Sequence, residues 1–177
     1  EYRGNNSALS YEIKPGITFR PFRTFKIGVT ADYIDNNDDL QYVATRDYLS
    51  EERYILGTID QKTVGFTLRL DLNITPEFSI QYYGSPFVSR GGYSEFKYVT
   101  NSVADIYDDR FTIYDNVVLS GDYYQFDENN DMVPDYSVRN PDFNFHQFRS
   151  NFVAKWEYRL GSTRYLVWAS EKTGYSG

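Results

Sequence analysis

The chain has 177 residues, and its 18 basic and 25 acidic side chains give a formal net charge of −7. It contains no cysteine and only one histidine, which excludes disulfide scaffolds, cysteine-based metal sites and histidine clusters within this chain. The acidic balance also disfavours nucleic-acid binding, because no basic surplus offsets phosphate charge. In contrast, 18 Tyr, 13 Phe and 2 Trp are far more aromatic residues than a disordered chain carries, so the sequence predicts a folded protein.

Two-residue alternation is strict over residues 63–74, and the same pattern recurs over residues 9–20, 25–33 and 148–159. A helix would spread the apolar residues around its surface, whereas a β-strand directs them to one face. The predicted apolar face includes Val64, Phe66, Leu68, Leu70, Leu72, Phe152 and Trp156. The predicted polar face includes Lys26, Asp32, Arg69, Asp71, Arg149, Lys155 and Glu157. The chain is therefore predicted to be all-β.

The connections between these segments differ in length. Residues near 21–24, 75–77 and 160–163 carry the Pro, Gly, Ser and Thr that favour tight turns. The regions near 35–53 and 85–145 are long and rich in acidic residues, and we expect them to be loops. In an up-and-down sheet the tight turns fall at one end and the long loops at the other. With long strands, that asymmetry is typical of transmembrane β-barrels.

We therefore predict that residues 1–177 form one region, the C-terminal part of an antiparallel up-and-down transmembrane β-barrel in the outer membrane of a Gram-negative bacterium. The apolar face would contact outer-membrane lipid and the polar face would line the lumen. The expected role is envelope transport or scaffolding, with other envelope proteins or glycan as further partners. A soluble antiparallel sandwich shows the same alternation, so a carbohydrate-binding β-sandwich with a calcium-stabilised loop is the alternative.

Several local motifs add a family resemblance. They are residues 54–63, 73–76, 81–84 and 140–145, followed by 147–151 and 156–159. Together they resemble the C-terminal region of a Bacteroidota outer-membrane family of unknown function, in which a domain similar to carbohydrate-binding module family nine precedes a predicted barrel. The resemblance, close from about Tyr54 to Trp168, implies an outer-membrane barrel and assigns no catalytic residue. The sugar-binding-like domain does not occur in this sequence, and the sequence does not finish on a strand with a terminal aromatic residue, as such barrels usually do. We therefore expect a fragment of a larger barrel. An accessory to a glycan hydrolase is a further alternative.

One acidic segment has the spacing of a calcium-binding loop. Oxygen ligands at Asp127, Asn129, Asp131, Val133 (by its backbone carbonyl) and Asp135 would occupy loop positions 1, 3, 5, 7 and 9. The match is incomplete, because Met132 stands where a glycine makes the sharp turn and Val138 stands where a glutamate usually closes the site. The pattern predicts a calcium loop, and a plain Asp- and Asn-rich turn is the alternative.

No constellation typical of catalysis occurs in the sequence. His146 is the single histidine, so a histidine-based triad cannot form within this chain. The adjacent acidic pairs Glu51-Glu52 and Asp108-Asp109 would point to opposite sides of an extended chain, whereas a glycosidase pair must flank one bond. We therefore expect no enzymatic activity from this stretch.

Overall fold

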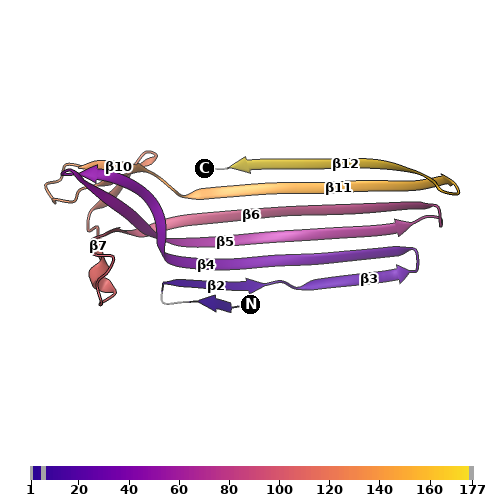
Figure 1. Ribbon diagram of the computed structural model, residues 1–177, viewed down its shortest axis with the longest axis horizontal. Coiled ribbons are helices and arrows are strands. Elements are labelled where there is room, and N and C mark those ends of the chain that lie inside the picture. Colours follow the sequence, from indigo (N-terminus) through magenta and orange to yellow (C-terminus); the bar gives the residue numbers. More distant parts are fainter. Residues whose placement is uncertain (1, 5–6, 176–177) are drawn as a thin grey trace.

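The computed structural model describes residues 2–4 and 7–175, and most of these residues lie in antiparallel β-strands (Figure 1). The strands are β1 (Tyr2–Gly4), β2 (Ala8–Ile13), β3 (Gly16–Phe22), β4 (Phe25–Tyr48), β5 (Glu51–Asn73), β6 (Phe78–Val99), β7 (Phe111–Ile113), β8 (Val117–Ser120), β9 (Tyr123–Phe126), β10 (Tyr136–Arg139), β11 (Phe143–Arg159) and β12 (Ser162–Tyr175). A 3-10 turn, η1 (Asp108–Arg110), precedes β7. The predicted all-β antiparallel architecture is confirmed. Within the described ranges, no helix is long and apolar enough to cross a membrane.

The large sheet has the strand order β1-β2-β4-β5-β6-β11-β12, with β3 beside β4 and β7 beside β6. Strands β2 and β3 pair with successive parts of β4, so they occupy one position in the sheet. Strand β12 forms one edge, and β3 with β1 and β2 forms the other (Figure 1). The described residues therefore form an open sheet, and no closed barrel is present among them.

The long strands are joined by tight turns at one end of the sheet, at the right of Figure 1. These turns lie at residues 23–24, 74–77 and 160–161. In the last, Gly161 has φ +75°, a conformation that a residue without a Cβ adopts readily.

The expectation of a long loop at 35–53 was wrong. Strand β4 continues to Tyr48 and β5 begins at Glu51, because backbone pairing needs no apolar side chain; Asp35 lies opposite Lys62 and Asn37 opposite Asp60. The hairpin closes at Leu49-Ser50, both with positive φ. Such a turn usually carries Asn or Gly, so this sequence offers no turn signal.

The expectation of a loop through 85–145 was also wrong at both ends and in the middle. Strand β6 extends to Val99, β11 begins at Phe143, and β8, β9 and β10 form a separate sheet in the order β10-β9-β8. The acidic and glycine residues of this region lie within paired strands as well as in the connections.

A hydrophobic core lies at the end of the sheet opposite the tight turns. Its buried members are Ile55, Phe96, Tyr114, Phe126 and Val138, drawn from β5, β6, β9, β10 and the β7–β8 connection. Phe126 is fully buried, 4.8 Å from the Tyr114 ring and 5.5 Å from the Phe96 ring between centroids. The small sheet packs there against the extended β4–β5 hairpin and the end of β6; we call this assembly the cap, residues 40–58 and 93–139.

Replacing Phe126 with alanine should destabilise the cap by about 3–5 kcal/mol, because the fully buried ring leaves a cavity. Thermal denaturation followed by near-UV circular dichroism would measure the loss. Tyr123→Ala is the matched control, since Tyr123 is an exposed aromatic residue of the same strand, β9. Similar melting of the two variants would contradict the cap core described above.

Candidate functional site

The polar residues predicted for one face of the sheet lie side by side across four strands. Lys26 of β4 pairs with Asp71 of β5, which pairs with Gln81 of β6. Two residues further along β4, Gly28 pairs with Arg69 of β5. Arg69 also pairs with Tyr83 of β6, and Tyr83 pairs with Asn151 of β11. Cross-strand partners share a face, so these rows form a continuous polar surface.

This polar surface is hollowed. A cavity of about 820 Å³ spans the β2–β3 connection and strands β3, β4, β5, β6 and β11. Its lining includes the predicted residues Lys26, Asp32, Arg69 and Asp71, together with Lys14, Tyr83 and Asn151. A hollow that reaches across so many neighbouring strands means that the sheet is concave on its polar face. We call this cavity the polar hollow.

Charges in the polar hollow are mostly paired. The Lys14 ammonium lies 2.7 Å from the Asp32 carboxylate, and the Lys26 ammonium lies 4.0 Å from the Asp71 carboxylate. The Arg69 guanidinium instead lies over the Tyr83 ring, 5.5 Å from its centroid. Among the residues that the structure describes, no carboxylate lies within ion-pair distance of Arg69.

The other predicted polar residues lie outside the polar hollow. Arg149 forms an ion pair of 3.5 Å with Glu171 of β12. Lys155 sits between Ser79 and Tyr165 in the strand register, near the tight-turn end. Glu157 accepts a hydrogen bond from the backbone N–H of Gly161 at 3.0 Å, so it also closes the β11–β12 turn.

The predicted apolar residues share the opposite face of the sheet. Leu68 pairs with Val29 and Leu70 with Ile27, and Phe152 pairs with both Tyr82 and Trp168. Val64, Phe66 and Trp156 are exposed, and Leu68, Leu70, Leu72 and Phe152 are partly exposed. Large neighbours on the same face are open as well, including Ile17, Phe19, Leu166 and Trp168. No element of the described chain covers this face.

The acidic segment from Asp127 to Asp135 forms a compact loop stabilised by its own backbone. Asp127 accepts hydrogen bonds from the N–H groups of Asp131 and Met132, Asn129 from that of Asp131, and Asp131 from that of Val133. Asp135 accepts from the N–H groups of Glu128 and Asn129. Across residues 2–4 and 7–175, no three His, Cys, Asp or Glu side chains are grouped as metal ligands. Calcium binding by this loop stays a prediction.

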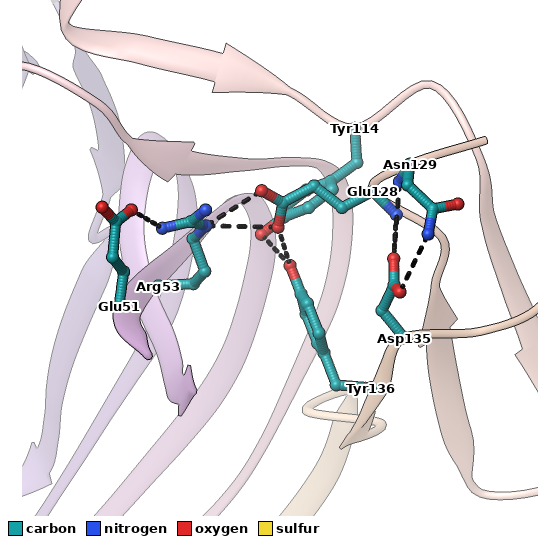
Figure 2. A network of polar contacts seen from close by, with 7 residues as sticks. All are labelled: Glu51, Arg53, Tyr114, Glu128, Asn129, Asp135 and Tyr136. Atoms are coloured by element: carbon teal, nitrogen blue, oxygen red, sulfur yellow. Dashed lines mark hydrogen bonds and ion pairs between the residues drawn. The ribbon is translucent and has the colours of Figure 1, made fainter. Parts of the chain in front are cut away.

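The loop also positions a buried ionic network that sequence reasoning missed (Figure 2). The Arg53 guanidinium donates from Nε to both carboxylate oxygens of Glu128, at 2.9 and 3.2 Å, and from Nη1 to Glu51 at 2.8 Å. The Arg53 and Glu128 side chains are only 14% and 11% exposed, whereas that of Glu51 is 73% exposed. Because Arg53 and Glu128 are 75 residues apart, no local motif links them.

Two tyrosines extend this network into the cap core. Tyr136 donates its hydroxyl to Glu128 at 2.9 Å, and the Tyr114 hydroxyl lies 2.6 Å from that of Tyr136 (Figure 2). Burial raises the pKa of both phenols far above the usual 10, and for Tyr136 the Tyr114 hydroxyl and the Glu128 charge raise it further. Both tyrosines therefore stay neutral hydrogen-bond donors at physiological pH. The arrangement can hold the cap together, because it links β5, the β7–β8 connection, the acidic loop and β10.

Replacing Glu128 with alanine should destabilise the cap by about 3–5 kcal/mol, because the largely buried Arg53 charge loses the carboxylate that is buried beside it. Hydrogen exchange of the β9 and β10 amides would detect the loss as faster local opening. Glu51→Ala is the control, since it removes an exposed carboxylate that is paired with the same arginine. This change should lower the stability of the cap by about 1 kcal/mol or less. Equal protection of these amides from exchange in the two variants would show that Glu128 does not stabilise the cap more than Glu51 does.

Comparisons with known proteins identify no relative of this chain. No family model, no curated protein and no solved structure matches it. The resemblance to a Bacteroidota outer-membrane family therefore stays a prediction.

Proposed function

We propose that this chain forms a sector of an outer-membrane β-barrel that serves envelope transport or scaffolding and carries out no catalysis in this stretch. The observation that supports it best is the apolar face of the large sheet, whose large side chains are exposed or partly exposed on every long strand. Val64 is 57% exposed and Trp168 58% exposed. Soluble proteins rarely leave so extensive an apolar surface uncovered, whereas a barrel turns it toward lipid.

The height of this apolar band suits a membrane. On β6 the band runs from Phe78 to Val88, and its limits on β5 are close to Leu72 and Val64. Ten residue steps at about 3.3 Å each cover about 33 Å, which a strand tilt of about 40° reduces to a height of about 25 Å. In the next row beyond the band, charged residues replace apolar ones at Asp35, Lys62 and Arg90.

The apolar side chains of strand β5 change from one side of the strand to the other where the strand leaves this band. From 63 to 73 its apolar residues are even-numbered, and the odd-numbered side faces the polar hollow. Nearer the start of the same strand, the buried apolar residues are the odd-numbered Ile55 and Ile59. A strand surrounded by lipid in one part and by water in another should show this reversal, because the apolar side faces outward in lipid and inward in water.

The soluble β-sandwich alternative fits less well. A sandwich buries the apolar face of its sheet against a second sheet. Here the small β10-β9-β8 sheet packs at the end of the large sheet, and the concave side of the large sheet is the polar one. A polar concave side is the expected lumen wall of a barrel.

A barrel needs more strands than the described residues supply. With β2 and β3 sharing one position, the long strands occupy six positions: β2–β3, β4, β5, β6, β11 and β12. The smallest outer-membrane barrels have about eight strands. Closure would therefore require further strands to pair with the edges at β12 and β3. The tight turns would face the periplasm and the cap would lie on the outer side.

Tryptophan quenching by brominated lipids tests the proposal directly, because the chain's 2 Trp residues both lie on the apolar face. Trp168, beside Phe152, should be quenched best by bromine in the middle of the acyl chain. Trp156, beside Arg164 near the tight turns, should be quenched best by bromine near the headgroup. The variants Trp156→Phe and Trp168→Phe report each residue alone. If both residues are quenched by aqueous acrylamide and by neither lipid, the membrane assignment fails.

Leu68→Arg should lower the free energy of unfolding in lipid vesicles by about 2–4 kcal/mol, because Leu68 lies near the middle of the apolar band. Val64→Arg, at the edge of the same band, should lower the free energy of unfolding by only about 1 kcal/mol or less. Urea titration of the two variants in vesicles measures the difference. A soluble core imposes no such dependence on depth, so equal costs would count against the barrel.

A further inference from the structure

The polar hollow holds one more basic group than acidic groups. Its lining contains Lys14, Lys26 and Arg69 against Asp32 and Asp71. Lys14 lies 2.7 Å from Asp32 and 3.9 Å from Glu12, which is outside the lining, and Lys26 lies 4.0 Å from Asp71, so the lysine charges are offset by these carboxylates. Arg69 is the remaining cation, in a chain whose overall charge is −7. Its positive charge is therefore a local property of the polar hollow.

The surroundings of Arg69 leave its fork of N–H donors available. In the described part of the chain, its side chain makes no hydrogen bond or ion pair and contacts the Tyr83 ring. On its other side lies Gly28, where an added Cβ would still meet nothing closer than 3.6 Å. The amides of Gln81 and Asn151 line the same hollow and also have no side-chain hydrogen bond to described residues. The site thus offers a guanidinium, two amides and open space.

We propose that the polar hollow binds a small solute through an oxyanion, a carboxylate or a phosphate, held by Arg69. A guanidinium presents its donors in a planar fork that matches two oxygens of such a group. The guanidinium lies over the Tyr83 ring, and the Gln81 and Asn151 amides supply further donors. The inference rests on the proposed function, since in a barrel this hollow is part of the lumen, and arginine-lined pores favour anions.

Isothermal titration calorimetry on the full chain in detergent micelles tests the site, with inorganic phosphate and acetate titrated separately. We expect one of the two to bind at a single site, and which one does so distinguishes phosphate-bearing from carboxylate-bearing solutes. Arg69→Gln should weaken that binding about 10- to 100-fold, because hydrogen bonds to a charged group are lost. Arg69→Lys keeps the charge without the fork and should retain only part of the affinity.

Arg149→Gln is the matched control, because Arg149 lies on the same face outside the polar hollow and is paired with Glu171. The affinity of this variant for the anion should equal that of the unmodified chain. Absence of binding by both anions, or equal weakening by Arg69→Gln and Arg149→Gln, would overturn the inference. The lipid-quenching experiment is independent of Arg69, so a failed membrane assignment and a failed anion site give different results.

Discussion

The continuous hydrogen-bonded ladder between β4, β5, β6, β11 and β12 is the constraint on which the rest of the structure depends. Because side chains alternate along each strand, a slip of one residue would exchange the apolar and polar faces. The register places Leu68 beside Val29 and Arg69 beside Tyr83, so it creates the apolar band and the polar hollow at once. Both faces are consequences of a single backbone alignment, and neither could change without the other.

Much of the large sheet could be predicted from alternation alone, since Val64 to Leu72 show it without interruption. The continuation of the strands through acidic residues could not, because backbone pairing is indifferent to whether a side chain such as Asp35 is charged. The turn at Leu49-Ser50 also lacked its usual residues. The strands of the small sheet have only four residues each, too few for a period to appear.

The candidate site was predictable to a similar extent. Alternation assigns Arg69 and Asp71 to one face, but only the register reveals that Lys26 meets Asp71 while Arg69 meets a tyrosine. The contact between Arg53 and Glu128 joins residues far apart in sequence, and depends on how the small sheet folds back. Pairing partners across a sheet are set by tertiary structure, and composition carries no information about them.

The open edge at β12 has a consequence for the order of assembly. Along this 14-residue strand, one row of backbone N–H and C=O groups has no partner strand in the described part of the chain. Within hydrocarbon, each such group would cost several kcal/mol, so a sheet with free edges cannot rest in a bilayer. In the proposed barrel, the sheet must therefore acquire its neighbouring strands before or during entry into the membrane, so closure cannot follow insertion.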